Sequence, residues 1–169
     1  MHKANKMKII DDKNIISFTK VDLPYGWLGN MAASPIEFNG LSWRTAEALF
    51  QSLRFDDPLL IDFCHKAKSP FGLKLSLKKH QHQMVIAPKS LEDIANMQSI
   101  LRLKFSQHPN LKQQLIDTSN AILIEDVSAR KSGNGKFWGA YLEDGYWIGD
   151  NMLGKLLMEL REELTNSEG

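Results

Sequence analysis

Apolar residues along the chain recur at two spacings, which together predict more helix than strand. Spacings of three and four residues, typical of a helix with one buried face, mark segments near residues 45–55, 58–64, 70–77, 91–105, 111–116 and 152–164. Near-alternating or short continuous apolar runs, typical of strands, mark residues 15–18, 36–43, 121–125, 138–142 and 146–148. The pattern predicts a mainly helical α+β single domain with short β-hairpins.

Turn and capping residues separate these segments and support their boundaries. Asn39-Gly40 lies between near-alternating apolar residues, which is a strong hairpin signal. Side chains that cap helix N-termini stand before the helical segments: Thr45, Asp57 before Pro58, Ser69 before Pro70, and Ser90 with Asp93 in an approximate capping box. We therefore expect helices to begin directly after these positions.

The helix expected after Thr45 carries a polar stripe beside its apolar one. Glu47, Gln51 and Arg54 stand at i, i+4 and i+7, so a carboxylate, an amide and a guanidinium share one helix face. A solvated helix surface is the simplest interpretation of such a stripe. A row of catalytic or binding groups is the alternative.

Composition narrows the class of protein. The chain has 169 residues, of which 43% are hydrophobic and 24% charged, and its formal net charge is +1. These values fit one globular domain with a sizeable core. There is no apolar run near the roughly 20 residues of a membrane helix, and no apolar signal region follows the polar N-terminus. The single cysteine, Cys64, lies among apolar residues and is expected to be a buried structural thiol. We expect a cytoplasmic protein without membrane association.

Charge is unevenly distributed despite the small net value. Residues 65–91 contain six lysines and no Asp or Glu, whereas acids gather toward the C-terminus. Such a basic segment attracts phosphate groups or forms a solvated helix face. His80-Gln81-His82 lacks the partners of a metal-site motif, and we predict no metal and no cofactor.

Three glycine-containing loops have the composition of binding loops. They cover residues 26–30, 132–139 and 149–154. Glycine permits close approach of backbone amides to a ligand, Trp138 offers a stacking plane, and the third loop leads into a helix N-terminus that favours anions. Ordinary turn chemistry is the alternative for each loop.

Taken together, these motifs make the chain recognisable, because it resembles the NADAR family over about residues 16–164. The resemblance rests on segments in the family's order: Gly26-Trp27-Leu28-Gly29-Asn30, Ser34 to Gly40, the helix with Glu47 and Gln51, Lys68-Ser69-Pro70, Phe137-Trp138-Gly139, and Gly149 to Met158 with Arg161. It implies a YbiA-like fold over residues 15–164, with an N-terminal extension at 1–14, partly flexible, and a C-terminal tail at 165–169.

The resemblance implies hydrolysis of a bond between ribose C1 and nitrogen. The substrates it implies are ADP-ribosylated guanine, in nucleic acid or in a nucleotide, or a related ribosyl-amine. An N-glycosidase of riboflavin-biosynthesis intermediates is a second interpretation, and a non-catalytic sensor of ADP-ribose or NAD-derived nucleotides is a third.

Site residues follow from the same resemblance. Glu47 corresponds to the family's helix glutamate and is the expected catalytic carboxylate. Gln51 is expected to orient water or ribose hydroxyls, with Asp126 as a second carboxylate. The expected substrate-binding residues are Trp27, Gly29, Asn30, Arg54, Lys68, Phe137, Trp138, Gly139 and Asn151.

Three positions depart from the common family pattern. Ala48 stands where the family has histidine, Gly135 where it often has an acid, and Arg54 where it often has lysine. Arginine cannot form an imine with an opened sugar, but it suits bidentate binding of phosphate or carboxylate. Arg54 is therefore expected to clamp an anion of the substrate.

Overall fold

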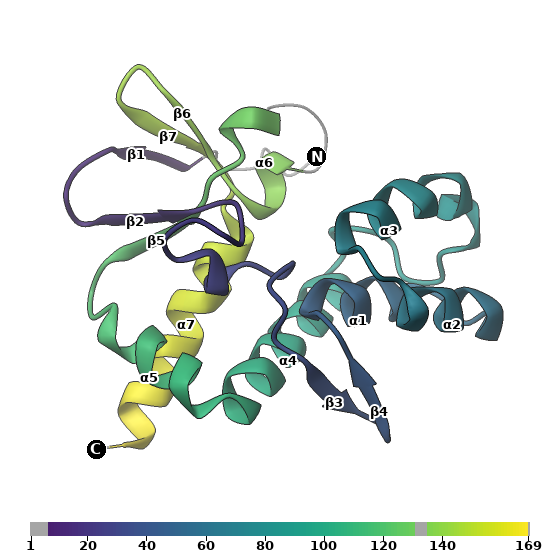
Figure 1. Ribbon diagram of the computed structural model, residues 1–169. Coiled ribbons are helices and arrows are strands. Elements are labelled where there is room, and N and C mark those ends of the chain that lie inside the picture. The colour runs from purple at the N-terminus through teal and green to yellow at the C-terminus, as the bar shows by residue number, and fades with distance from the viewer. Residues whose placement is uncertain (1–6, 131–134, 169) are drawn as a thin grey trace. The chain divides into compact units, whose positions relative to one another are not determined.

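The computed structural model describes residues 7–130 and 135–168, whose strands and helices belong to two units (Figure 1). The terminal unit contains both ends of the chain, Met1–Gly29 and Lys112–Gly169, and the central unit contains Asn30–Leu111. The chain thus passes from one unit to the other twice, after Gly29 and within α5 (Pro109–Asp117).

The terminal unit is built on two small sheets. One is antiparallel with strand order β1-β7-β6, and the other pairs β2 with β5 in parallel. The strands are β1 (Met7–Ile10), β2 (Ile15–Phe18), β5 (Ile122–Glu125), β6 (Tyr141–Glu143) and β7 (Tyr146–Gly149). Short helical segments follow at η1 (Gly26–Leu28), η3 (Ser128–Arg130) and α6 (Gly135–Trp138).

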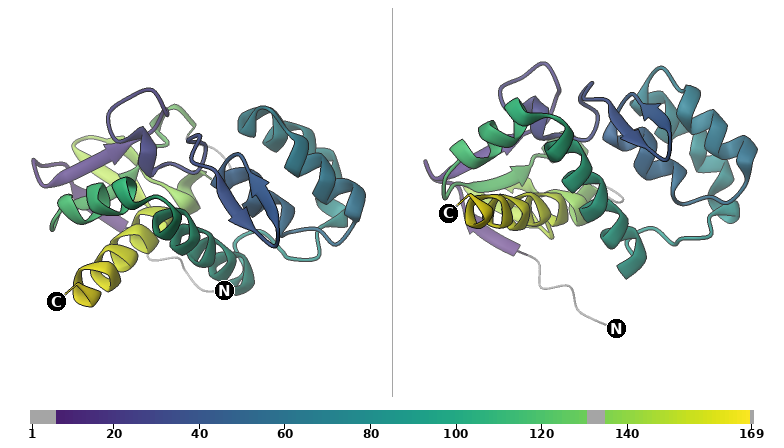
Figure 2. Two further views of the ribbon diagram at one scale, coloured as in Figure 1. Left: turned by 60° about the horizontal axis from the view of Figure 1, so that its bottom comes forward. Right: turned by 90° about the horizontal axis from the view of Figure 1, so that it is seen from below.

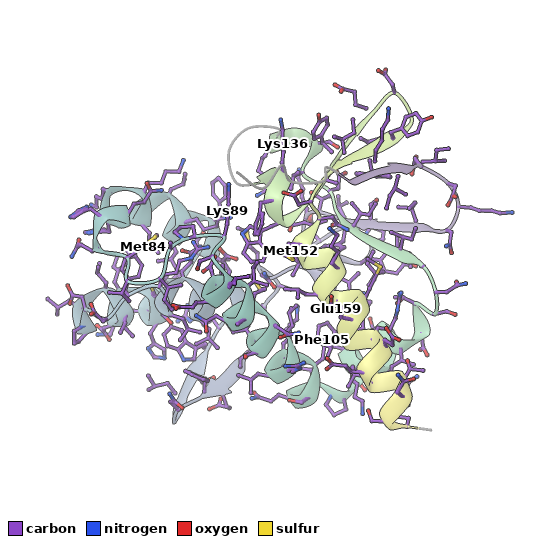
Figure 3. All side chains as sticks on the ribbon, turned by 180° about the vertical axis from the view of Figure 1, so that it is seen from behind. Met84, Lys89, Phe105, Lys136, Met152 and Glu159 are labelled. Carbon is purple, nitrogen blue, oxygen red and sulfur yellow. The ribbon has the colours of Figure 1, made fainter. Side chains whose placement is uncertain are left out.

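The long C-terminal helix α7 (Met152–Ser167) packs against β5. Its apolar residues at i, i+3, i+4 and i+7 are buried: Leu153, Leu156, Leu157 and Leu160. Figure 3 shows Met152 at the start of this helix and Glu159 further along it. A Cβ on Gly154 would overlap the Leu123 carbonyl oxygen of β5, so glycine is what permits this close packing.

The central unit contains one hairpin and most of the helices. Its elements are β3 (Ile36–Phe38), β4 (Leu41–Trp43), α1 (Ala46–Ser52), α2 (Pro58–Lys66), α3 (Pro70–Leu77), η2 (Lys78–Gln83) and α4 (Leu91–Gln107). Helix α1 contacts α2, α3 and α4, and each of its seven residues is buried. Strand β3 lies against α4, as the further views in Figure 2 show.

The expected turn and caps are confirmed. Asn39 and Gly40 have φ angles of 48° and 79°, the left-handed pair that a tight hairpin turn requires. Four side chains accept hydrogen bonds from the first turns of their helices: Thr45, Asp57, Ser69 and Ser90. Cys64 is fully buried, and this burial raises the pKa of its thiol to about 12, as expected of a structural thiol.

The structure differs from the sequence-based expectations at several element boundaries. The helix expected over residues 45–55 ends at Ser52, so Arg54 lies in the turn after it. Residues 7–10 of the expected extension form β1, because Met7–Ile10 pairs with β7. Helix α7 continues to Ser167 rather than ending at 164, and Trp138 ends a short helix instead of beginning a strand. The α+β class, with helices predominant, is as expected. None of the helices in the described ranges is long and apolar enough to cross a membrane.

Substitution of Gly154 by alanine tests the packing of α7 on β5. The added methyl group would overlap the backbone of Leu123 and the side chain of Asn151, so we expect the free energy of unfolding to fall by about 1–3 kcal/mol. Gly72→Ala is the matched control, because Gly72 is also helical and its nearest neighbour would lie at 3.4 Å. This control should be neutral or stabilise by up to about 1 kcal/mol in urea unfolding. Equal effects of the two changes would refute the close-packing explanation.

Candidate functional site

The polar stripe of α1 is buried rather than solvated. Glu47, Gln51 and Arg54 are 6%, 5% and 6% exposed. Burial of one amide and two charged groups costs free energy unless they form hydrogen bonds or ion pairs within the protein. The interpretation of this stripe as a solvated helix surface is therefore wrong.

The three side chains form a continuous row of contacts. Gln51 Nε2 donates a hydrogen bond to Glu47 Oε1 at 2.8 Å. Arg54 Nη1 donates to Gln51 Oε1 at 3.4 Å. Because Arg54 only donates, the oxygen of the Gln51 amide must face it, and the amide nitrogen must face Glu47. The guanidinium thus fixes which end of Gln51 meets the carboxylate.

Arg54 is itself held by Asp93 of α4. Its Nε and Nη2 donate to the two carboxylate oxygens of Asp93, each at 2.8 Å, and Asp93 is fully buried. Asp93 Oδ2 also accepts the backbone N–H of Lys89 at 2.9 Å. Figure 3 shows Lys89 where the loop from Met84 enters α4. The pair has the two-pronged geometry of the strongest charge-assisted contacts.

Asn30 is joined to Glu47 by a hydrogen bond between their backbones. Its carbonyl oxygen accepts the Glu47 N–H at 3.0 Å, and its side-chain Nδ2 lies 3.2 Å from the sulfur of Met97. The Asn30 side chain is buried, yet its Oδ1 has no hydrogen-bond partner among the described residues. Buried acceptors without partners are rare and call for an explanation.

Lys74 of α3 approaches the same row from outside. Its Nζ lies 3.9 Å from Glu47 Oε1, and its side chain is 42% exposed, against 8% for that of Glu47. Lys68, which precedes α3, is exposed. Within the central unit, the structure thus brings together Asn30, Glu47, Gln51 and Arg54 of the predicted residues, and adds Asp93 and Lys74.

The other predicted residues belong to the terminal unit, where two of them have structural contacts. Asn151 is fully buried, donates to the Leu123 carbonyl at 2.8 Å and accepts the Glu125 N–H at 3.1 Å. Its side chain therefore ties the start of α7 to β5. Gly139 lies so close to β5 that a Cβ would overlap the Glu125 carbonyl oxygen.

Asp126 and the aromatic residues have mixed surroundings. Asp126 Oδ1 accepts the Ser128 N–H at 2.8 Å, a contact that shapes the turn after β5. Phe137 and Trp138 are half-buried, and their rings meet edge to face at 5.0 Å. Trp27 lies 6.4 Å from the Tyr25 ring, and Gly29 directly follows the short helix that contains Trp27. Residues 132–134 of the glycine-rich loop lie outside the described residues.

Two further features were not predicted as functional. Lys104 on α4 is fully buried, and this burial lowers the pKa of its ammonium to about 7. A groove along α7 is lined by residues including Ser119, Glu159 and Arg161, none of which belongs to the predicted site. In the part of the chain that the structure describes, no three His, Cys, Asp or Glu side chains are grouped as a metal site.

Comparison with known proteins identifies the family of the chain. The model of the NADAR domain matches residues 17–165, and the chain belongs to this family. It is 32% identical to N-glycosidase YbiA of Escherichia coli over 165 residues, 96% of each chain. An N-glycosidase of Nostoc punctiforme is 29% identical over 154 residues, 89% of this chain and 93% of that protein.

A solved structure shows the same relationship. The NMR structure of the Escherichia coli protein YbiA matches with a TM-score of 0.72 and 31% identity, covering 95% of this chain and 90% of that one. A riboflavin biosynthesis protein of Vibrio vulnificus is 31% identical over 150 residues, 88% of this chain and 38% of that longer protein. These relationships place the chain among enzymes of the N-glycosidase type, which are hydrolases.

The residues that sequence reasoning missed are those whose role depends on a distant partner. The sequence indicates Asp93 only as part of a capping box. Its backbone N–H does donate to Ser90 Oγ, at 3.2 Å. Arg54, buried in the turn that follows α1, requires a carboxylate partner from elsewhere in the chain. Lys74 was one of several lysines in the basic segment, with nothing local to distinguish it.

Neutralising one member of the Arg54–Asp93 pair tests how much the pair contributes to stability. Asp93→Asn leaves a buried guanidinium without its counter-charge, so we expect a loss of about 3–5 kcal/mol in the free energy of unfolding. The matched control is Asp62→Asn, which removes the exposed Lys66–Asp62 pair at 2.7 Å and should cost at most about 1 kcal/mol. Both are measured by urea unfolding. A cost for Asp93→Asn as small as that of the control would show that the buried charges are satisfied in another way.

Proposed function

We propose that this N-glycosidase hydrolyses the bond between ribose C1 and nitrogen, with Glu47 as the catalytic carboxylate. The substrate is an ADP-ribosylated guanine or a related ribosyl-amine. The observation that carries the proposal is the buried Glu47–Gln51 contact, which fixes one oxygen of a carboxylate on a helix shared with the family. Asp126 and Trp138 remain predicted members of the site.

The two oxygens of Glu47 have different surroundings. Oε1 accepts the Gln51 amide at 2.8 Å and faces Lys74, whereas Oε2 accepts no hydrogen bond from the described residues. Cleavage of the C1–N bond develops positive charge at C1 and requires a water to attack there. We assign Oε2 to this task, either taking a proton from that water or stabilising the charge at C1.

Gln51 holds this carboxylate, and Arg54 in turn holds Gln51. One N–H of the Gln51 amide is given to Glu47, and the second is left for a ribose hydroxyl or the attacking water. The Nε and Nη2 atoms of Arg54 donate to Asp93, and its Nη1 donates to Gln51. We therefore assign Arg54 a positioning role in place of the substrate clamp that the sequence suggested.

Asn30, whose backbone bonds to that of Glu47, supplies a second acceptor. Its Oδ1 is buried without a partner among the described residues, and a ribose hydroxyl is a donor of suitable chemistry. In contrast, the side-chain amide of Asn151 forms hydrogen bonds with the backbone of β5, and we assign Asn151 a structural role.

The name of the Vibrio vulnificus relative favours a second candidate substrate, a ribosylated amine of riboflavin biosynthesis. Incubation with ADP-ribosylated guanosine, an ADP-ribosylated oligonucleotide and a ribosylated pyrimidine amine distinguishes the candidates. Mass spectrometry of the released base and sugar identifies the substrate. Binding of ADP-ribose without release of any base would instead support the non-catalytic sensor.

Replacement of Glu47 by glutamine tests the catalytic assignment. Glutamine keeps the size of the side chain but cannot accept a proton or carry negative charge, so we expect kcat to fall by about 10²–10⁴ with the fold retained. Glu92→Gln is the control, because Glu92 is exposed in the first turn of α4 and should keep full activity. A folded Glu47→Gln protein whose kcat lies within a few-fold of the unchanged chain would exclude this carboxylate.

Replacement of Asn30 by alanine separates binding from stability. Oδ1 has no partner among the described residues, and Nδ2 has only the weak acceptor sulfur of Met97, so alanine should change the free energy of unfolding by less than about 1 kcal/mol. Loss of its bond to the sugar should nevertheless raise KM several-fold. Urea unfolding and steady-state kinetics are measured on the same preparation. An unchanged KM, or a large loss of stability with unchanged kinetics, would assign Asn30 to the fold alone.

A further inference from the structure

Two cations lie along the Glu47–Gln51 row, and they differ in how their charge is used. Arg54 is 6% exposed, and each of its three guanidinium nitrogens has a contact within the protein. Lys74 is 42% exposed along its side chain and makes one ion pair, with Glu47. The separation of 3.9 Å in that pair exceeds hydrogen-bond length. Lys74 is therefore the more exposed of the two cations, and its ammonium makes no hydrogen bond among the described contacts.

We propose that Lys74 binds the phosphate group attached to the ribose of the substrate. This inference rests on the proposed function, since the ADP-ribose group of the first candidate substrate contains a ribose that carries a phosphate ester. The sequence had suggested Arg54 for an anion contact, but the structure commits that guanidinium to Asp93. The two tasks are thereby divided: Arg54 positions Gln51, and Lys74 contacts the anion.

The position of Lys74 suits this role. It stands on α3, which packs against α1, and its ammonium reaches the edge of the buried Glu47 carboxylate. An ammonium on a flexible four-carbon stem carries three donors and binds phosphate as a point charge. It can therefore turn from Glu47 toward a phosphate without disturbing the helix.

Ribose 5-phosphate and ribose are the probes for this proposal, with binding followed by NMR titration of the full chain. We expect ribose 5-phosphate to bind more tightly than ribose. Lys74→Ala should weaken binding of ribose 5-phosphate by about 10- to 100-fold, the usual effect of losing a charge-assisted hydrogen bond, and leave ribose binding unchanged. Lys74→Arg should retain affinity to within a few-fold, because the charge is kept.

Lys78→Ala is the matched control, since Lys78 is exposed one turn further along the chain and should have no effect. The proposal is overturned if the unchanged protein shows no preference for the phosphorylated sugar. It is equally overturned if Lys74→Ala weakens both sugars alike, or if Lys78→Ala has the same effect as Lys74→Ala.

The outcome is separable from that of the proposed function, because sugar binding requires no turnover. Loss of ribose 5-phosphate affinity in Lys74→Ala, in a protein that releases no base, would support the phosphate site and refute the hydrolase. Turnover that depends on Glu47 but keeps its KM for phosphorylated substrate in Lys74→Ala would refute the phosphate site alone.

Discussion

The buried ion pair between Arg54 and Asp93 sets the arrangement on which the candidate site depends. A charged group in a protein interior is tolerated only when its partner is close and well aligned, and here both guanidinium prongs meet both carboxylate oxygens at 2.8 Å. Once Arg54 is held in this way, its remaining nitrogen determines how the Gln51 amide is turned. The orientation of Glu47 follows from that amide. A contact between the turn after α1 and helix α4 is thus transmitted through Gln51 to the carboxylate of Glu47.

Local features of the fold were predictable because their causes are local. The hairpin at Asn39-Gly40 requires two left-handed residues, and the caps at Thr45, Asp57 and Ser69 bond to amides within three positions of themselves. The spacing of Glu47, Gln51 and Arg54 was likewise sufficient to put them on one face. Strand β1 was not predictable in this way, since its four residues are ordered by pairing with β7, over a hundred positions later.

The roles of the polar residues were less predictable than their positions. Burial of the α1 stripe depends on helices α2, α3 and α4, whose packing against α1 the sequence pattern does not encode. Asn151 illustrates the reverse case. An asparagine in a glycine-rich loop suggested a ligand contact, but the chain uses its amide to join β5 to the start of α7. The family resemblance suggested these residues without stating what each one touches.

Interdependence of Arg54 and Asp93 also constrains how this protein can diverge. The resemblance suggests that family members often have lysine at position 54, and a lysine presents no fork to match the Asp93 carboxylate. Replacing Asp93 by a neutral residue leaves the Arg54 guanidinium buried without its counter-charge, whereas lysine at 54 keeps the charge but loses the two-pronged contact. Among descendants of this chain, the two positions should therefore change together. Chains that have arginine at 54 and aspartate at 93 should also share the orientation of Gln51.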